Sequence, residues 1–251
     1  MDGFLARLGM TRRGDYGYDA PYALIGFAIA GSVATAAALI AWWTRSAPPL
    51  PRLVAAALLW ANAASFCYTT RRGKFIEWER ILDELSLRGD EHVLDMGCGR
   101  GAILTAVARR LRTGRITGID LWISRDQSGN AREVTRRNAE LEGAADRIEV
   151  ETADMRKLPF ADASFDVVVS SLAIHNIASN QDRAQAVADA WRVVKPGGRV
   201  VIADIRATAL YARTLAALGA SGVTRRRLGW RFWWGNPFAP TMLVVASKAI
   251  D

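Results

Sequence analysis

His92-Val93-Leu94-Asp95-Met96-Gly97-Cys98-Gly99-Arg100-Gly101 is the stretch of sequence that decides the fold. Its first residues form a short apolar strand that ends in a carboxylate, and three glycines at alternate positions follow it. Glycine allows a tight turn and lets the backbone approach a bound ligand closely. A glycine-rich turn between a strand and a helix is weak evidence by itself, because dinucleotide enzymes use similar turns. The distinguishing pattern here is G-x-G-x-G after an acidic residue, in place of G-x-G-x-x-G.

Strands and helices alternate on the carboxyl side of this turn. The strands are short and mostly apolar, as expected for strands that are covered on both faces. We predict strands at 92–95, 115–120, 147–152, 165–170 and 199–205, a final strand pair at 223–233 and 241–247, and helices at 102–111, 130–142, 182–194 and 208–218. Such alternation predicts an α/β domain with a parallel sheet between two layers of helices.

Four further motifs accompany the glycine-rich turn in a fixed order. Asp120 ends the second strand in Gly118-Ile119-Asp120, where a carboxylate can accept hydrogen bonds from both hydroxyls of a ribose. Asp154 and Met155 follow the third strand, where a carboxylate can receive an adenine amino group. The last two motifs are 158–170, which reads Leu-Pro-Phe before the fourth strand, and 193–198, which ends in Lys-Pro-Gly-Gly.

Together these motifs resemble the class I S-adenosylmethionine (SAM)-dependent methyltransferases over about residues 90–205. The similarity is to the branch with quinone, sterol and other small-molecule or lipid acceptors. It implies a Rossmann-like, seven-stranded, mostly parallel sheet whose last strand is antiparallel, within a domain that covers residues 90–251. It also implies S-adenosyl-L-methionine as the cofactor.

The resemblance assigns roles to individual residues of the predicted cofactor site. Gly97, Gly99 and Gly101 would line the methionine and ribose part, and Asp95 would approach the amino group of SAM. Asp120 would take the ribose hydroxyls, and Asp154 with Met155 would take the adenine. The rest of the expected set is Cys98, Leu121, Trp122 and Ser170. For Trp122, ordinary packing is an equal alternative to contact with the adenine or ribose.

His175 lies just after the fourth strand, in Ser170-Ser171-Leu172-Ala173-Ile174-His175-Asn176, which should face the transferred methyl group. An imidazole there could deprotonate a hydroxyl or amine of the acceptor. The alternative is that His175 only walls the pocket or bonds to the backbone. The chain has no Asn-Pro-Pro-Tyr-like run, no Pro-Cys nucleophile and no Asp/Asn cluster, so we expect neither nucleic-acid bases as acceptors nor a metal site.

Two uncharged apolar runs precede this domain. Residues 22–43 would form a helix of roughly 33 Å and residues 53–70 one of roughly 27 Å, against a hydrocarbon core of about 30 Å. Three prolines in the short connection predict an antiparallel pair. The length of the first run and the presence of a second one fit a signal peptide poorly. A pair of buried or dimer-forming helices in a soluble protein is the alternative.

Arginines predict the orientation of this hairpin. Arg7, Arg12 and Arg13 precede it and Arg71, Arg72 and Lys74 follow it, whereas the connection holds only Arg45 and Arg52. Positive charge favours the cytoplasmic side. We therefore expect an integral protein of the cell membrane, with residues 1–21, the linker helix in 71–89 and both termini in the cytoplasm.

The charge of the chain is unevenly distributed. The net charge is +8, and residues 205–250 contain no Asp or Glu. Residues 225–234, Arg-Arg-Arg-Leu-Gly-Trp-Arg-Phe-Trp-Trp, mix cations with aromatic rings, which suits a membrane interface better than nucleic acid beside two apolar helices. Ordinary strand packing is a third interpretation.

The sequence thus favours methylation of a small lipophilic acceptor reached from the bilayer. A soluble acceptor, with the hairpin as anchor or dimer contact, and a non-catalytic SAM-binding scaffold are the alternatives. A homo-oligomer is compatible with each of these readings. The two cysteines, Cys67 and Cys98, lie in different contexts and predict neither a disulfide nor a metal site.

Overall fold

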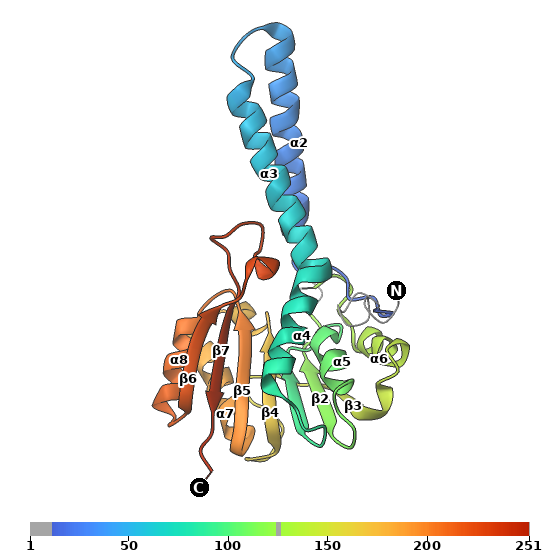
Figure 1. The fold of residues 1–251 in the computed structure, drawn as a ribbon, viewed down its shortest axis with the longest axis vertical. Helices are drawn as coiled ribbons and strands as arrows, with labels where there is room; N and C mark the ends of the chain where they lie inside the picture. The colour runs from blue at the N-terminus through green and yellow to red at the C-terminus, as the bar shows by residue number, and fades with distance from the viewer. Residues whose placement is uncertain (1–11, 124–126, 251) are drawn as a thin grey trace.

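The computed structural model describes residues 12–123 and 127–250. It consists of a long helical hairpin that stands on one edge of an α/β domain (Figure 1). Arg7, which was part of the predicted charge flank, lies outside the described residues.

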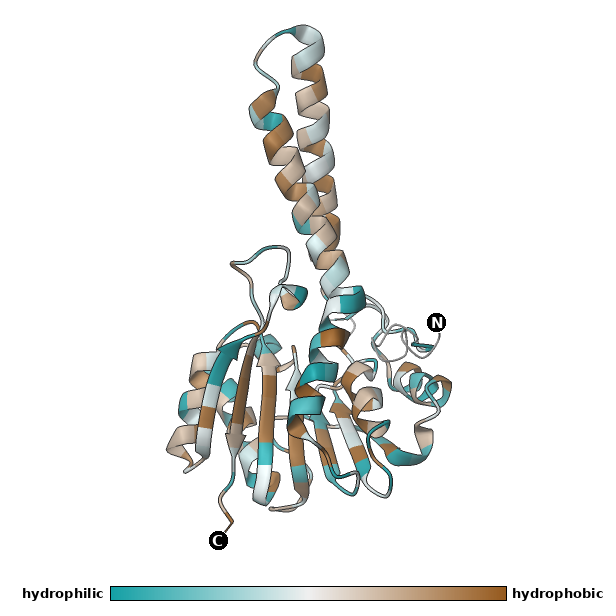
Figure 2. Cartoon of the chain, viewed as in Figure 1, coloured by the Kyte–Doolittle hydropathy of each residue, from teal (hydrophilic) through white to brown (hydrophobic). Residues whose placement is uncertain are grey.

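The hairpin is formed by α2 (Pro21–Thr44) and α3 (Leu50–Tyr68), which pack against each other along their length. The predicted spans were 22–43 and 53–70, so both helices were found with shifted ends. Gly31 of α2 leaves room for the ring of Trp60 on α3. Apolar residues recur along the whole length of both helices (Figure 2).

Among the described residues, two helices are long and apolar enough to cross a membrane, namely α2 and the helical run from Leu50 to Leu85. Only 11% and 17% of their most apolar windows are buried inside the protein. Most of this apolar surface therefore faces outward, unlike that of a core helix in a soluble domain.

The second hairpin helix does not end where it reaches the domain. A π-helical turn, η1 (Thr69–Gly73), joins α3 directly to α4 (Lys74–Leu85), and the whole run reads as one long helix in Figure 1. One face of α4 is buried in the core beneath it, with Trp78 fully enclosed. The helix expected as a linker is therefore also an element of the domain core.

The sheet contains seven strands in the order β3-β2-β1-β4-β5-β7-β6. β7 is antiparallel to both of its neighbours and the other pairings are parallel, which confirms the predicted fold. The strands are β1 (His92–Met96), β2 (Arg115–Asp120), β3 (Ile148–Thr152), β4 (Phe165–Ser171), β5 (Val194–Asp204), β6 (Ser221–Arg227) and β7 (Met242–Ser247).

Helices cover both faces of the sheet. One core layer lies under α4 and α5, and the other lies under α7 and α8. The helices of the domain after α4 are α5 (Ala102–Ala108), α6 (Arg132–Leu141), α7 (Asn180–Val193) and α8 (Thr208–Ala217). Short 3-10 turns occur at η2 (Ala145–Arg147), η3 (Ile174–Asn176) and η4 (Trp230–Phe232).

The strand predicted at 223–233 is wrong in its second half. Pairing of β6 with β7 ends at Arg227, and the chain then enters η4. Leu228 and Phe232 are buried, whereas Trp230 between them is 54% exposed. A strand would place all three side chains on one face, so this pattern fits a chain that leaves the strand and enters a short helical turn. The basic residues 225–227 thus lie on an edge strand, and the aromatic residues lie in the segment beyond it.

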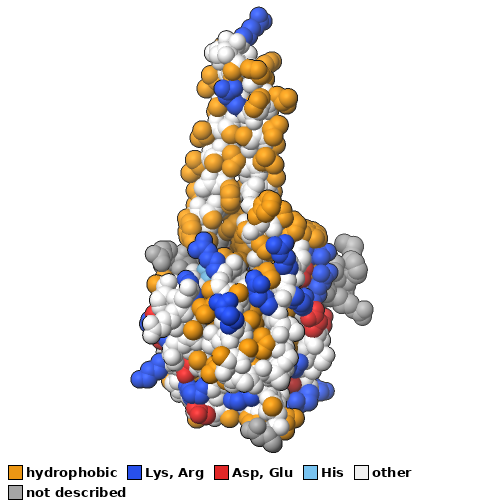
Figure 3. Space-filling model, turned by 90° about the vertical axis from the view of Figure 1, so that its left-hand side faces the viewer, with side chains coloured by type: hydrophobic (Ala, Val, Ile, Leu, Met, Phe, Trp, Pro, Cys, Tyr) orange, Lys and Arg blue, Asp and Glu red, His pale blue; other side chains and the backbone are white. Residues whose placement is uncertain are grey.

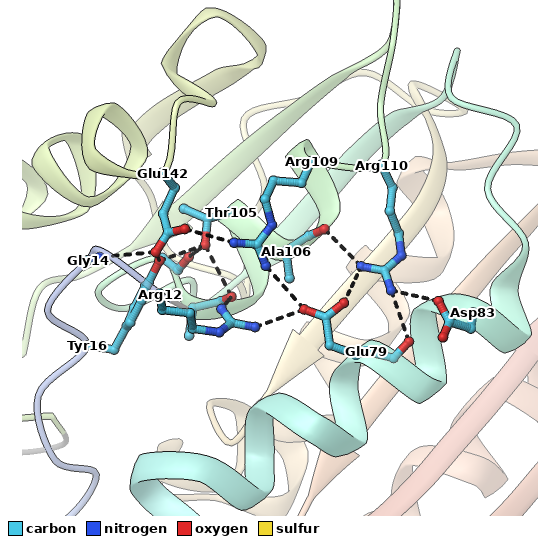
Figure 4. A network of polar contacts seen from close by, with 12 residues as sticks. Arg12, Gly14, Tyr16, Glu79, Asp83, Thr105, Ala106, Arg109, Arg110 and Glu142 are labelled. Atoms are coloured by element: carbon cyan, nitrogen blue, oxygen red, sulfur yellow. Dashed lines mark hydrogen bonds and ion pairs between the residues drawn. The ribbon is translucent and has the colours of Figure 1, made fainter. Parts of the chain in front are cut away.

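The N-terminal strap, residues 12–20, lies across α4, α5 and α6 (Figure 4). Arg12 bonds Glu79 at 3.0 Å, and Glu79 also pairs with Arg109 and Arg110. The Tyr16 hydroxyl bonds Thr105 and Glu142 at 2.9 and 3.0 Å. These contacts hold the strap in place between the domain and the start of α2.

Substitution of Gly73 tests the packing at the junction between the hairpin and the domain. A Cβ at Gly73 would collide with the main-chain oxygen of Arg231, whereas one at Gly26 on α2 would meet nothing within 4 Å. We expect Gly73→Ala to lower the free energy of unfolding by about 1–3 kcal/mol through overpacking. Gly26→Ala should change it by no more than about 1 kcal/mol, in the stabilising direction. Thermal unfolding in detergent micelles measures both, and equal effects would contradict this account of the junction.

Candidate active site

A cavity of about 550 Å³ opens at the carboxyl ends of the parallel strands, directly below the hairpin. This edge of an open α/β sheet is where such folds bind ligands. Its lining comes from the loops after β1, β2, β3, β4 and β5, from the strap, and from the base of both hairpin helices. Of the predicted site residues, those on the cavity wall are Asp95, Gly97, Cys98, Gly99, Asp120, Leu121, Asp154, Met155 and His175.

Asp95 is the most unusual group on this wall. Its side chain is buried, and neither oxygen accepts a hydrogen bond of normal geometry from the described residues. Burial, followed by repulsion from Asp120, raises the pKa of Asp95 to about 8. A buried carboxylate without partners is costly, and a cationic ligand group beside it would remove most of that cost.

The glycine-rich turn is packed too closely for side chains. Gly97 has a φ of 74°, and a Cβ there would collide with the Cβ of Ala173. Gly99 has a φ of 51°, and a Cβ there would lie 2.5 Å from the side-chain oxygen of Gln127. Both positions therefore require glycine for conformation and for space, and the turn leaves its backbone open to the cavity.

Asp120 holds the loops around it. Its two oxygens accept hydrogen bonds from the backbone NH of Gly99 at 2.9 Å, from the NH of Trp122 at 2.7 Å and from Asn130 at 3.1 Å. An ionised carboxylate offers about four acceptor positions, so hydroxyl donors from a ligand can still be accommodated. Asp120 consequently shapes the turn as well as facing the cavity.

Asp154 is paired with a cation from its own loop. Arg156 bonds both of its oxygens at 2.5–3.0 Å, and this contact lowers the pKa of the Asp154 carboxyl below its usual value. Arg156 also lies 3.6 Å from Asp182 at the start of α7. The side chain of Met155 lies beside Gly97, so this loop and the glycine-rich turn face each other.

Three predicted cofactor residues lie off the cavity wall. Gly101 has a φ of 82° at the start of α5 and packs against Thr135. The Trp122 indole donates to Thr152 on β3 at 2.8 Å, which matches its alternative role in packing. Ser170 is buried and donates to the carbonyl of Met96, because alternate strand residues face opposite sides and Ser171 is the one that reaches the cavity.

His175 is one half of a hydrogen-bonded pair. Its Nδ1 lies 2.5 Å from Oδ1 of Asp204, which ends β5 and is fully buried. The backbone NH groups of His175 and Ile205 donate to the same carboxylate at 3.0 and 2.7 Å, and the Tyr211 hydroxyl does so at 3.2 Å. Burial and the neighbouring Asp204 raise the pKa of Tyr211. The imidazole is thus fixed through one nitrogen.

Sequence reasoning missed Asp204, which holds His175 from behind the cavity lining, and two groups that line the cavity itself. Lys74 from α4 pairs with Asp19 of the strap at 2.5 Å, and Asp19 also accepts a bond from Gln127 at 3.0 Å. A carboxylate at the end of an otherwise apolar strand was the available signal for Asp204. No sequence signal indicated that the strap would return to the cavity.

The upper end of the cavity is apolar. Tyr22 and Ala23 of α2, Phe66 of α3 and Trp234 line it, and Phe66 meets Trp234 with ring centroids 5.0 Å apart. The same hollow therefore has charged groups at the strand ends and apolar groups at the base of the hairpin.

Residues 94–202 match the family described as "Methyltransferase domain". The methyltransferase GfsG of Streptomyces halstedii is 37% identical over 128 residues, which are 51% of this chain and 42% of that protein. The ubiquinone/menaquinone biosynthesis C-methyltransferase of Roseobacter denitrificans is 34% identical over 126 residues, 50% of this chain and 47% of the relative. The chain thus spans about half the length of these curated relatives, or less.

Solved structures share the fold. Geranyl diphosphate methyltransferase in complex with SAM aligns with a TM-score of 0.56 over 70% of this chain and 85% of that one, at 16% identity. The [4+2]-cyclase SpnF aligns with a TM-score of 0.56 over 69% and 82%, at 18% identity. Residues 94–202 therefore resemble a methyltransferase domain, and the fold around them is one that a SAM-binding methyltransferase shares.

The raised pKa of Asp95 predicts how many protons are released when the cofactor binds. At pH 6.5 the buried carboxyl is mostly protonated, and an ammonium group placed beside it would favour the ionised form. We expect SAM binding to release on the order of one proton, as linkage requires. Calorimetry in two buffers of different ionisation enthalpy measures this number.

Two variants control the experiment. Asp95→Asn should bind SAM more weakly and release no proton, because it cannot titrate. Asp154→Asn should bind more weakly with the proton release unchanged, because Asp154 is already ionised beside Arg156. A proton release that persists in Asp95→Asn would show that another group is responsible.

Proposed function

We propose that this chain is an integral-membrane SAM-dependent methyltransferase that methylates a small lipophilic acceptor drawn from the bilayer. One observation carries the proposal: a single cavity joins the cofactor-site residues, such as Asp95 and His175, to the base of the hairpin at Tyr22 and Phe66. Cofactor can thus reach the site from water and an apolar acceptor from lipid.

The surface of the hairpin supports the membrane part of the proposal. Large apolar side chains are exposed along both helices, and Trp43 at the tip is 84% exposed. Isolated exposed apolar residues are normal, whereas a contiguous surface of this extent needs a covering such as lipid. Figure 3 shows apolar side chains down the hairpin and Lys and Arg gathered on the domain just below it.

Charge at the two ends of the hairpin supports its orientation. The tip carries Arg45 and Arg52, and the domain end carries Arg13, Arg71 and Arg72 among the described residues. The balance favours a cytoplasmic domain by the positive-inside rule. The catalytic edge of the sheet lies below the hairpin, so in this orientation the cavity would take its cofactor from the cytoplasm.

The residues on the cavity wall fit SAM. The backbone of Gly97 and Gly99 would lie against its methionine and ribose part, with Asp95 near the amino group. Asp120 would receive the ribose hydroxyls, and the loop of Asp154 and Met155 would hold the adenine. When bound, SAM supplies an electrophilic methyl group, whose displacement needs alignment and exclusion of water more than covalent help.

His175 is the proposed general base. The Asp204 carboxylate accepts a hydrogen bond from Nδ1–H in this arrangement, so Nε2 of the neutral ring carries no proton and can take one from an acceptor hydroxyl or amine. The buried Asp204 also stabilises the imidazolium that forms. Its bonds to two backbone NH groups and to Tyr211 keep this pair in place.

The relatives agree with a small-molecule acceptor. Their names specify ubiquinone or menaquinone biosynthesis and, for an enzyme of Amycolatopsis mediterranei that is 35% identical over 128 residues, 27-O-demethylrifamycin SV. These names describe those proteins, and the family match covers residues 94–202, which do not include the hairpin. The bilayer as the source of the acceptor is inferred from the cavity and the hairpin.

The direct test incubates the chain in lipid nanodiscs with methyl-labelled SAM and a total membrane lipid extract. We expect label in an organic-phase product. Label only in a water-soluble extract would replace the proposal with a soluble acceptor and make the hairpin an anchor or dimer contact. SAM binding without any transfer would favour a scaffold, and the cyclase with this fold shows that methyl transfer does not follow from fold alone.

The base role of His175 predicts a separation of turnover from binding. We expect His175→Ala to lower kcat on the labelled acceptor by about 100-fold or more while SAM affinity is unchanged, because proton removal alone is lost. His92→Ala is the matched control, since His92 is exposed at the opposite end of β1. Normal turnover of His175→Ala would leave the histidine as a pocket wall only.

A further inference from the structure

The loop that joins η4 to β7 leaves the domain and runs beside the hairpin. We call residues 233–240 the hairpin-contact loop; it rises next to the lower part of α3 in Figure 1. The chain needs no such excursion to connect its neighbours, because a bridge between Trp233 and Pro240 already closes the base of the loop. The six residues between them extend toward the hairpin.

Three contacts hold the hairpin-contact loop against the hairpin. The Thr69 hydroxyl donates to the carbonyl of Trp233, and the ring of Trp234 packs edge-on against Phe66. Asn236 donates from its amide to Oδ1 of Asn62 at 2.9 Å. Asn62 is an uncharged polar residue within the second apolar run, and its own amide donates to the carbonyl of Leu58 at 2.7 Å. Its oxygen is therefore satisfied by the loop, as a polar group near lipid requires.

Contacts with both hairpin helices show how far the hairpin-contact loop reaches along the hairpin. Gly235 lies beside Phe27 and Asn62, since a Cβ on it would be 3.5 Å from the ring of Phe27 and 3.0 Å from Asn62. Phe27 is 17 positions from Thr44, or about 26 Å along α2, and Asn62 is 12 positions from Leu50, or about 18 Å along α3. Both distances are shorter than a hydrocarbon core of about 30 Å.

Phe238 occupies the outer part of the loop. It is 93% exposed, the highest exposed fraction among the large apolar side chains. Asn236 accepts a hydrogen bond from its backbone NH at 2.9 Å, so the tip of the loop is a defined turn. A phenylalanine that is 93% exposed buries almost none of its ring against the described residues, and acyl chains beside the hairpin would cover it.

We infer that the hairpin-contact loop is a third membrane-embedded element, which inserts Phe238 at the near boundary of the hydrocarbon layer. The inference rests on the proposed membrane position of the hairpin. It also defines a route for the acceptor, because Trp234 at the foot of the loop lines the catalytic cavity together with Phe66 and Tyr22. A lipophilic molecule would enter sideways from the bilayer past these three rings.

Residues on the domain side of the loop are of the kinds that proteins place at the level of the lipid head groups. Trp230 is 54% exposed and stacks on Tyr68, with ring centroids 5.3 Å apart, and the guanidinium of Arg231 lies 4.8 Å from its ring. Tryptophan and arginine together are typical of the zone between lipid and water. The order from domain to hairpin is thus basic, aromatic and apolar, as the proposed depth requires.

Site-specific fluorescence tests the depth of the loop. The chain is made with Cys67 replaced by Ser and one new cysteine at Phe238, Val33 or Leu218, labelled with an environment-sensitive dye and reconstituted in phosphatidylcholine vesicles. Some vesicles carry a nitroxide near the head group and others carry it near the end of the acyl chain. Cys98 is buried but lines the cavity, so a chain without a new cysteine is treated in parallel to measure any dye that reaches it.

The controls separate the loop from the hairpin. Val33 lies about 17 Å from the tip along α2 and should be quenched most by the deep nitroxide. Leu218, an exposed apolar residue beyond α8, should not be quenched. We expect Phe238→Cys to lose fluorescence to the shallow nitroxide more than to the deep one.

The remaining outcomes each count against a different statement. Quenching at Val33 without quenching at Phe238 would overturn the inference and leave the membrane hairpin intact. Equal quenching at Phe238 and Leu218 would also overturn it, because adsorption of the whole domain would then explain the signal. No quenching at Val33 would instead remove the membrane position on which both proposals rest.

Discussion

The continuity of one helix from Leu50 to Leu85 constrains everything else in this chain. Its upper part is half of the hairpin, and its lower part, α4, is buried in the core through Trp78, whose indole donates to Ser171 on the rim of the cavity at 2.8 Å. A hinge between anchor and domain would let the two move independently. An unbroken helix fixes the height and the direction of the cavity relative to the hairpin, so the apolar end of the cavity must face the hairpin base.

Local signals were sufficient to predict the α/β domain. Apolar strands, a glycine-rich turn and helical periodicity each act over a few residues, and the resemblance supplied the position of the antiparallel β7. The ends of helices and strands were harder to predict. Residues 228–232 read as a strand by composition, but Leu228 and Phe232 are buried while Trp230 between them is exposed, because the chain enters a short helical turn there. That burial depends on η1 and α4, which are distant in sequence, and so no local pattern contains it.

The glycines and carboxylates of the candidate site could be predicted, because the backbone geometry or the end of a strand determines the residue type there. Gly97 and Gly99 have no room for a Cβ, and the carboxylates Asp95 and Asp120 end strands that meet at one edge. The direction of side chains was not predictable in the same way. Ser170 and Ser171 differ by one position and face opposite sides of the sheet, and Trp122 turns toward β3. Asp204 acquires its role only through the fold, because β5 brings it beside His175.

In the proposed function, the two kinds of substrate would impose opposite demands on one cavity, and different segments of the chain would meet them. The charged, hydrated cofactor needs strand-end carboxylates and exposed backbone, which the sheet provides. A lipophilic acceptor needs an apolar approach, which the sheet edge cannot provide because it is surrounded by water. The base of the hairpin and Trp234 supply it, while Lys74 and Asp19 pair with each other at 2.5 Å on the cavity wall. Pairing these charges lowers the cost of placing them where an apolar molecule would pass. The polar strap and the aromatic loop thus divide the cavity into a charged half and an apolar half.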